Sequence, residues 1–285
     1  MISIILTTFN EPQTLSRAIK SILEQKIDQD YEILVIGPDK QTAQVVNKFL
    51  LKYPQIKYLK DQGKGKPAAL NLGFQRARGE IYVCTDGDVY IGKNSLKALL
   101  RPFQDDKVGA VTGQPISLNP KNNLFGYWAY FLTQAAHQWR LKGNNFPCSG
   151  YLYAFRPLIN KIPANVLAED GIITEMIRQK GGQIKYAPQA QVYVKYPDNF
   201  KDWLKQKVRS TGGYKQKQSR GERNFKQELK SGLKLFFTLP QNLKEYFWTI
   251  LLYLARIYLW LKIFWEIKIK NESLAKIWQR VESTK

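Results

Sequence analysis

Two carboxylates stand one residue apart around a glycine in Asp86-Gly87-Asp88, directly after the short apolar run 81–85. That run has the composition of a buried strand. In an open α/β sheet, ligands bind beyond the carboxyl ends of the strands. Neighbouring acids there repel each other unless a cation compensates them, and carboxylate oxygens suit Mg²⁺ or Mn²⁺, which in turn suit a diphosphate. The tripeptide therefore predicts a metal site, with an Asp-Gly hairpin turn as the alternative.

A glycine-rich segment, 61–73, carries Lys64 and Lys66 and leads into a helical pattern. Backbone N–H groups at a helix start, together with a lysine, can face a phosphate. The segment does not have the P-loop spacing, because no Gly-Lys-Ser/Thr follows four intervening residues. A phosphate-binding turn and an ordinary solvated loop both remain open for this segment.

The elements that must position these residues alternate between strand and helix patterns. Strands are predicted at 3–8, 32–36, 56–59 and 81–85, and helices at 14–25, 42–52 and 124–141. Such alternation is typical of βαβ units and predicts an α/β fold with a mostly parallel sheet.

Composition sets limits on the class of protein. The 285 residues carry a formal net charge of +21, which indicates an anionic partner such as a nucleic acid, an acidic membrane or a phosphorylated substrate. The two cysteines, Cys84 and Cys148, supply neither a disulfide framework nor a metal-ligand cluster, so a reducing cytoplasm is favoured. The first residues form a strand pattern rather than a signal peptide.

The order and spacing of four segments resemble the family 2 glycosyltransferases of the glycosyltransferase-A fold. The segments are Ser-Ile-Ile-Leu-Thr-Thr-Phe-Asn-Glu at 3–11, Asp39 after the second strand, Gly-Lys-Pro-Ala-Ala-Leu-Asn at 65–71 and Cys-Thr-Asp-Gly-Asp at 84–88. The resemblance covers roughly residues 1–215. It implies a Rossmann-like catalytic domain over 1–215, followed by a basic linker and hydrophobic helices over 216–285.

The resemblance implies roles for particular residues. Asp86 and Asp88 would hold Mg²⁺ or Mn²⁺ on the diphosphate of a nucleotide sugar, Asp39 would contact the nucleobase, and Lys66 would lie near the nucleotide. The other expected nucleotide-binding residues are Thr8, Asn10 and Glu11. Many relatives have paired acids where this chain has Gly37-Pro38-Asp39, so the identity of the base stays open.

A second acidic pair, Glu169-Asp170, begins a helical pattern. By itself the pattern is equally compatible with a structural role for Asp170, as the N-cap of that helix. In the family this aspartate is the general base, and the resemblance implies that Asp170 takes the proton of an acceptor hydroxyl. The two interpretations are compatible, although the positive end of a helix lowers basicity. The segment 146–156 resembles the family strand beneath the acceptor site, with Gly150 allowing close approach.

The third chemical element is Gln206-Lys-Val-Arg209, which resembles the Gln-x-x-Arg-Trp helix of the family. There the arginine steadies the diphosphate leaving group, a task that suits its permanent charge and paired donors. Ser210 replaces the expected tryptophan, which stacks on the acceptor sugar in chain-extending members. Processive synthesis is therefore an open question.

The C-terminal part combines a basic segment, 201–234, with an apolar aromatic run, 246–261. At about 1.5 Å per residue the run spans roughly 24 Å, short of a hydrocarbon core of about 30 Å, and Arg256 lies near its middle. Flanking lysines and dense Trp and Tyr content favour a helix lying in the headgroup region. A single span reaching residue 269 and a helix docked on the catalytic domain are the alternatives.

The expected protein is an inverting, metal-dependent glycosyltransferase at the cytoplasmic face of the plasma membrane, either peripheral, monotopic or single-pass. It would move a sugar from a UDP- or GDP-sugar to a saccharide or lipid-linked acceptor. A nucleotidyltransferase or nucleotide-sugar-binding module would share the sheet and metal without needing Glu169-Asp170 or Gln206 and Arg209. A nucleic-acid-binding protein would use the charge but leave the acidic pairs unexplained.

Overall fold

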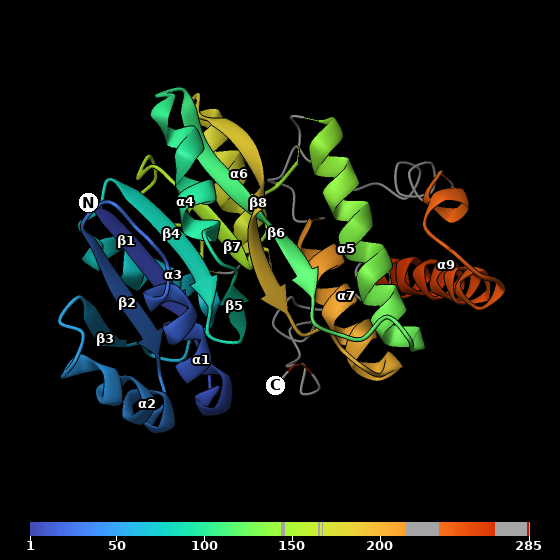
Figure 1. Cartoon of the computed structure of the whole chain (residues 1–285), viewed down its shortest axis with the longest axis horizontal. Coiled ribbons are helices and arrows are strands. Elements are labelled where there is room, and N and C mark those ends of the chain that lie inside the picture. The colour runs from blue at the N-terminus through green and yellow to red at the C-terminus, as the bar shows by residue number, and fades with distance from the viewer. Residues whose placement is uncertain (144–145, 165, 167, 215–233, 266–283, 285) are drawn as a thin grey trace. The chain divides into compact units, whose positions relative to one another are not determined.

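Figure 1 shows the computed structural model of the chain, which describes residues 1–143, 146–164, 166, 168–214, 234–265 and 284. The chain divides into two compact units. The first contains Met1–Ile116 and Gly143–Val194, and the second contains Ser117–Lys142 and Lys195–Thr284. Residues 117–142 and 195–214, expected in the catalytic domain, thus belong to the second unit; the domain boundary at 215 stays a prediction.

The first unit is built on a sheet with the strand order β3-β2-β1-β4-β7-β6-β8-β5. Its first four strands are parallel, with β1 between β2 and β4. They are β3 (Ile56–Lys60), β2 (Tyr31–Gly37), β1 (Ile2–Thr7) and β4 (Ile81–Asp86). All six residues of β1 are buried, as expected for a central parallel strand covered on both faces. The predicted strands in this half are confirmed.

The other half of the sheet contains antiparallel pairs. β7 pairs antiparallel with β4 and β6, and β5 pairs antiparallel with β8. These strands are β5 (Val89–Ile91), β6 (Val108–Ser117), β7 (Leu152–Phe155) and β8 (Gln183–Val194). The α/β class is confirmed, but the sheet is mixed rather than mostly parallel. Because β5 pairs with β8 and not with β4, the hairpin alternative for Asp86-Gly87-Asp88 is wrong.

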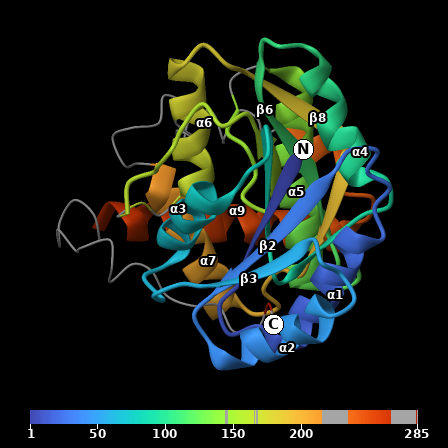
Figure 2. The ribbon, with the colours of Figure 1, turned by 90° about the vertical axis from the view of Figure 1, so that its left-hand side faces the viewer.

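Helices cover both faces of this sheet. They are α1 (Pro12–Leu23), α2 (Lys40–Leu50), α3 (Lys66–Arg76), α4 (Ser95–Leu100) and α6 (Glu169–Gln179), with a short 3₁₀ turn at Arg101–Gln104. Figure 2 shows α3 and α6 on one side of the sheet and α1 on the other. Gly73 lets α3 approach closely, since a Cβ there would lie 2.8 Å from Ile5 of β1.

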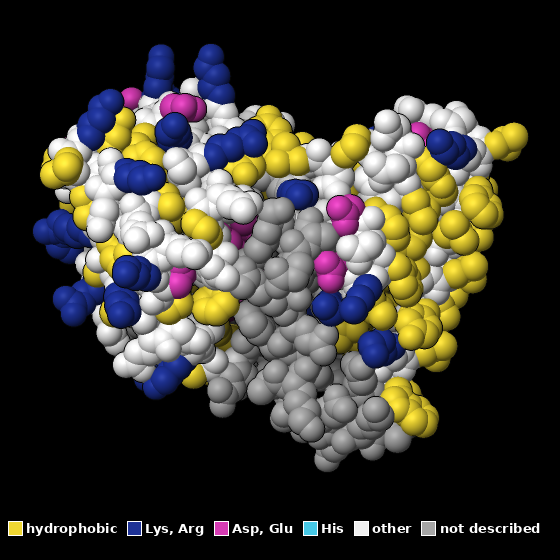
Figure 3. Space-filling view, turned by 90° about the horizontal axis from the view of Figure 1, so that it is seen from below, with side chains coloured by type: hydrophobic (Ala, Val, Ile, Leu, Met, Phe, Trp, Pro, Cys, Tyr) yellow, Lys and Arg dark blue, Asp and Glu magenta, His cyan; other side chains and the backbone are white. Residues whose placement is uncertain are grey.

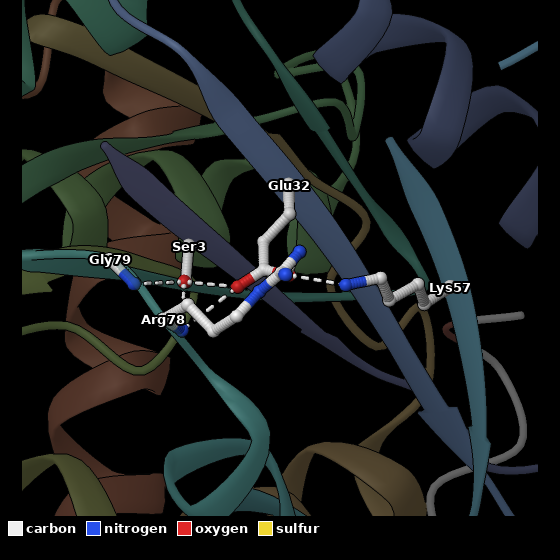
Figure 4. A network of polar contacts seen from close by, with 5 residues as sticks. All are labelled: Ser3, Glu32, Lys57, Arg78 and Gly79. Atoms are coloured by element: carbon white, nitrogen blue, oxygen red, sulfur yellow. Dashed lines mark hydrogen bonds and ion pairs between the residues drawn. The ribbon is translucent and has the colours of Figure 1, made fainter. Parts of the chain in front are cut away.

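A polar network closes the amino ends of the parallel strands (Figure 4). The buried Glu32 carboxylate accepts hydrogen bonds from Ser3 Oγ at 2.8 Å and Arg78 N at 2.9 Å, and it pairs with Lys57 Nζ at 3.0 Å. Ser3 Oγ also accepts the Gly79 amide at 2.8 Å. Burial raises the pKa of Glu32, but the bonds from Lys57, Arg78 and Ser3 lower it below its ordinary value. Glu32 therefore stays charged, and the opposite strand ends are left for ligands.

The second unit is helical. Its main elements are α5 (Leu124–Lys142), α7 (Phe200–Tyr214) and α9 (Leu243–Phe264). Aromatic side chains of α5 and α7 form its core with α9, and Trp128 Nε1 donates to the Trp248 carbonyl at 2.8 Å. The predicted helix 124–141 is confirmed, and core packing accounts for its aromatic face. Of the predicted basic segment 201–234, residues 215–233 lie outside the described residues, as do residues 266–283 of the tail.

Candidate active site

The candidate site lies where β1 and β4 end. Asp86 is the last residue of β4 and lies beside Thr7 in the sheet register. Thr7 Oγ1 donates to Asp86 Oδ1 at 2.9 Å, so the end of β1 fixes the first carboxylate. Gly87 and Asp88 then form the turn that leads to β5. The Asp-Gly-Asp motif is thus held at the carboxyl end of a central strand, the place where ligands bind in open α/β sheets.

Lys66 joins this carboxylate to the start of another helix. It is the first residue of α3, after Gly65 in a positive-φ conformation of 93°. Its Nζ lies 2.8 Å from Asp86 Oδ1 and 2.9 Å from Glu169 Oε1, and it donates to the Gly150 carbonyl at 3.3 Å. Burial lowers the pKa of Lys66, but the charges of Asp86 and Glu169 raise it well above its ordinary value. The ammonium group therefore stays charged between two acids.

Asp170 follows Glu169 in the first turn of α6. The N-cap of this helix is Ala168, so the prediction of Asp170 as N-cap is wrong. The carboxylate instead accepts the Gly171 amide at 2.8 Å through Oδ1 and the Gly150 amide at 2.9 Å through Oδ2. A Cβ at Gly150 would lie 3.3 Å from Asp170 Oδ2, which explains why a glycine serves at this point of approach.

The surroundings of Asp170 make its carboxylate a stronger base than an ordinary aspartate. Burial raises its pKa most, and the neighbouring charge of Glu169 raises it further. Lys66 and the two amides act in the opposite direction, and the resulting pKa is about 6. The lowering of basicity expected from the helix start is thus outweighed by burial and by Glu169. A carboxylate with a pKa near neutrality is suited to accept a proton from a hydroxyl group.

Gly150 belongs to a segment that three side chains hold in place. Three consecutive amides of residues 148–150, which we call the 148–150 strap, each donate to a side chain. The pairs are Cys148 N to Thr174 Oγ1 at 2.9 Å, Ser149 N to Thr112 Oγ1 at 2.8 Å, and Gly150 N to Asp170 Oδ2 at 2.9 Å. Sequence reasoning missed Thr112 and Thr174. The one available signal was a threonine on the apolar inner face of the 170–178 helix.

Asp39 is occupied by contacts within the protein. As the N-cap of α2, its Oδ1 accepts the Thr42 amide at 2.7 Å, and its Oδ2 accepts the Asn10 amide at 2.9 Å and the Thr42 hydroxyl at 2.8 Å. Burial raises the pKa of Asp39, but these hydrogen bonds lower it below its ordinary value. Asp39 therefore ties the loop after β1 to α2. Its contact with a nucleobase stays a prediction.

The same loop packs against the acidic turn. Thr8 Oγ1 donates to Glu11 Oε2 at 3.2 Å. A Cβ on Gly87 would lie 2.7 Å from Thr8 and 3.1 Å from Glu11 Oε2, so both residues crowd the glycine between the two aspartates. The structure thus brings Thr8, Asn10, Glu11 and Asp39 to the strand ends that carry the acidic turn.

Gln206 and Arg209 lie one helical turn apart on α7 in the second unit. Gln206 is buried, and Arg209 is partly exposed. Because the position of this unit relative to the first is not determined, their predicted part in the site stays a prediction.

The acidic turn is better suited to a cation that binds together with a phosphate ligand than to a metal ion held by protein side chains alone. Among the described residues, no group of three or more His, Cys, Asp or Glu side chains is placed to hold a metal ion. Asp86 and Asp88 supply two hard carboxylates, and Mg²⁺ commonly takes one or two carboxylates with substrate phosphates and waters as its other ligands. The donor set therefore suits Mg²⁺ or Mn²⁺ bound together with a diphosphate.

A sequence profile named glycosyl transferase family 2 matches residues 3–162, which include the acidic turn, Lys66, Asp39 and the 148–150 strap but not helix α6. The match covers more than half of the chain. The chain belongs to this family, as its motifs predicted.

Relatives of known name agree with this assignment. The probable glycosyltransferase YdaM of Bacillus subtilis is 27% identical over 230 residues, which are 74% of this chain and 54% of YdaM. The poly-beta-1,6-N-acetyl-D-glucosamine synthase of Staphylococcus aureus is 26% identical over 226 residues, 75% of this chain and 54% of the synthase. The chain therefore spans about half the length of the curated relatives that it matches.

A solved structure shares the fold. The mannosyltransferase PcManGT of Pyrobaculum calidifontis, solved in complex with GDP-Man and Mn²⁺, superposes with a TM-score of 0.60 at 19% identity. The match covers 87% of this chain and 72% of that one. It confirms the predicted glycosyltransferase-A fold.

Proposed function

We propose that the protein is an inverting glycosyltransferase that moves a sugar from a nucleoside diphosphate sugar to a hydroxyl group of an acceptor. One observation carries the proposal: Lys66 Nζ lies between Asp86 and Glu169 at 2.8 and 2.9 Å, and Asp170 lies next to this pair through Gly150. Asp86, for which we propose a metal-binding role, the ammonium group of Lys66, and Asp170, for which we propose the role of base, therefore lie together beyond the end of β4. Family membership favours sugar transfer over the nucleotidyltransferase and nucleic-acid-binding alternatives.

The donor half of the reaction rests on the acidic turn. Asp86 and Asp88 would hold Mg²⁺ or Mn²⁺, which when bound neutralises charge on the diphosphate. The presence of GDP-Man and Mn²⁺ in PcManGT supports this part of the proposal. Thr8, Asn10, Glu11 and Asp39 would bind the nucleotide of a UDP- or GDP-sugar. Lys66 and Arg209 would add positive charge as the nucleoside diphosphate leaves.

The acceptor half rests on Asp170. Its carboxylate takes the proton of the acceptor hydroxyl while that oxygen attacks the anomeric carbon. The new bond joins the acceptor oxygen to the anomeric carbon, and the bond from that carbon to the phosphate oxygen breaks. Because the two bonds lie on opposite sides of the carbon, a single displacement inverts its configuration. The amides of Gly150 and Gly171 hold the carboxylate in place during this step.

The acceptor is proposed to be a saccharide or a lipid-linked sugar at the cytoplasmic face of the plasma membrane. The similarity to a polysaccharide synthase supports a saccharide acceptor. The net charge of +21 supports a position near anionic lipids.

The test of the base compares Asp170→Asn with Asp105→Asn, an exposed aspartate of the first unit. We expect Asp170→Asn to keep donor affinity and to lose about 10²- to 10⁴-fold in transfer rate, the usual contribution of a general base. Asp105→Asn should change neither quantity. Transfer is measured as nucleoside diphosphate released in the presence of acceptor, and donor affinity by calorimetry. Retention of most activity by Asp170→Asn would refute the assignment.

The donor site is tested separately with Asp88→Asn. We expect this variant to lose the gain in thermal stability that Mn²⁺ and a nucleotide sugar together give the wild type. A screen of UDP-, GDP- and dTDP-sugars in the same assay identifies the base. Release of pyrophosphate instead of nucleoside diphosphate would assign the protein to the nucleotidyltransferases.

A further inference from the structure

Helix α9 buries two of its polar side chains, Glu245 and Thr249, against the second unit. Glu245 pairs with Lys121 at 3.0 Å and accepts the Gln241 amide at 2.9 Å, and Thr249 Oγ1 lies 2.8 Å from the Tyr127 hydroxyl. Glu245 and Thr249 are 7% and 0% exposed. The same face continues along the helix with buried Leu252, Ala255, Leu259 and Ile263. The inner face of α9 is therefore fixed to the second unit along its whole length.

The outer face of α9 is apolar. Six large side chains at spacings of three and four residues form one row, which we call the α9 stripe: Phe247, Ile250, Leu254, Ile257, Leu261 and Phe264. Their exposed fractions run from 44% to 64%. In Figure 3, hydrophobic side chains gather over α9 at the right. A surface helix of a soluble protein has the opposite arrangement, with its polar side chains outward.

The stripe is large for a soluble monomer. Six half-exposed side chains leave on the order of 500 Å² of apolar surface in contact with solvent. The largest apolar patch on a typical soluble monomer measures roughly 300–600 Å², so the stripe lies in the upper part of that range. Further exposed apolar side chains of the second unit include Leu141, Phe200 and Phe237. A continuous surface of this size marks an interaction site.

We propose that the α9 stripe lies in the interfacial region of an anionic bilayer, with α9 parallel to the membrane plane. The charge of the chain, +21, is complementary to anionic headgroups. Lys244 near the start of α9 and Lys262 near its end lie at headgroup level, and Tyr258 and Trp265 add the aromatic residues typical of that region.

The inner face of α9 decides against a helix that crosses the bilayer. By length and composition alone, Leu243–Phe264 could cross a membrane. Crossing would separate Glu245 from Lys121 and Thr249 from Tyr127, and it would place these polar groups in hydrocarbon. An orientation in the membrane plane keeps every one of these contacts and places only the stripe in lipid.

The first test is co-sedimentation of the full chain with phosphatidylglycerol–phosphatidylcholine vesicles. The test variant is Phe247→Gln, Leu254→Gln and Leu261→Gln together, because glutamine preserves helix propensity at exposed positions. The control is Leu51→Gln with Leu158→Gln, which removes exposed leucines from the first unit. We expect the test variant to lose at least about tenfold in vesicle partitioning and the control to match the wild type. Equal sedimentation of the test variant would overturn the proposal.

The second test measures depth. Cys84 and Cys148 are buried, so an environment-sensitive fluorophore on Leu254→Cys labels one site. Spin-labelled lipids with the nitroxide near the headgroup should quench this label more strongly than lipids with the nitroxide near the chain end. Stronger quenching from the chain end would place the middle of α9 at the bilayer centre and overturn the in-plane orientation.

A second copy of the chain is the competing occupant of the stripe. Light scattering without lipid decides this point: a wild-type dimer that the triple glutamine variant converts to a monomer would overturn the lipid assignment. The proposal is independent of the transfer reaction, because the sedimentation assay contains no donor or acceptor. Donor binding by the triple variant should equal that of the wild type.

Discussion

Removing the Thr174 hydroxyl tests whether this side chain aligns the proposed base Asp170 in addition to stabilising the fold. Thr174 is 1% exposed, and its hydroxyl accepts the Cys148 amide at 2.9 Å while donating to the Asp170 carbonyl at 2.6 Å. It therefore links the 148–150 strap to the helix turn that carries Asp170. Thr174→Val keeps the shape of the side chain and removes both hydrogen bonds.

The size of the effect follows from these contacts. A buried amide left without a partner costs about 1–3 kcal/mol, so Thr174→Val should lower the free energy of unfolding by that amount. The strap also carries the Gly150 amide that holds Asp170 Oδ2. A displacement of about 1 Å at a reacting group can cost about 10²-fold in rate. We therefore expect kcat to fall about 10- to 100-fold, with little change in KM for the donor.

The assay combines steady-state transfer rates with chemical denaturation of the same preparations. The matched control is Ser21→Ala, because the buried Ser21 hydroxyl accepts the Ile91 amide at 3.0 Å and donates to the Ala18 carbonyl at 2.8 Å. Ser21→Ala should lower the free energy of unfolding by a similar amount and keep the wild-type kcat. Thr174→Ser should restore most of the kcat. A Thr174→Val enzyme with wild-type kcat would refute the view that the strap aligns the base.

Four further outcomes are expected from the contacts of individual residues. The transfer rate should fall as the pH drops below about 6, because Asp170 then takes up a proton. Glu169→Gln should move this fall to lower pH, because the charge of Glu169 raises the pKa of Asp170. Profiles of rate against pH measure both effects. Gly150→Ala should lower kcat and leave the melting temperature nearly unchanged, because the new Cβ would lie 3.3 Å from Asp170 Oδ2. Transfer rates and melting curves measure the two effects. Cys84 should resist thiol reagents until the protein unfolds, because burial raises its pKa to about 12, and titration with a chromogenic disulfide measures this. Glu32→Gln should lower the free energy of unfolding by about 2–3 kcal/mol at neutral pH. This loss should shrink as the pH falls below about 4, because the pKa of Glu32 is lower in the folded than in the unfolded chain and the unfolded chain is therefore protonated first. Denaturant titrations at several pH values measure the change.

The parts of the site that the sequence predicted are set by local pattern. Asp86 ends an apolar run that has the composition of a buried strand, and Lys66 follows a glycine turn that begins a helix. Each residue therefore lies at an element end that neighbouring residues define. The order of these ends along the chain then matched a known family, which linked Glu169-Asp170 to the same site.

The parts that the sequence did not predict depend on pairing between distant residues. Strand direction in the second half of the sheet is one such part, since β5 pairs with β8 about a hundred residues later. The strap is another, because its acceptors Thr112 and Thr174 come from β6 and α6. For α9, hydropathy indicated an apolar helix but not that Glu245 and Thr249 face inward. Only their partners decide that orientation: Lys121, which precedes α5, and Tyr127, which lies on it.

The two ends of the parallel strands offer a comparison that separates folding from function. Glu32 holds the amino ends through Ser3, Lys57 and the Arg78 amide, whereas Thr174 acts at the carboxyl ends, where Asp170 lies. Both substitutions are expected to cost a similar free energy of unfolding, but only Thr174→Val touches the alignment of the base. If the candidate site is the catalytic one, the two variants will lie at the same stability and differ about 10- to 100-fold in kcat. Equal rates at equal stability would mean that the 148–150 strap does not align the base.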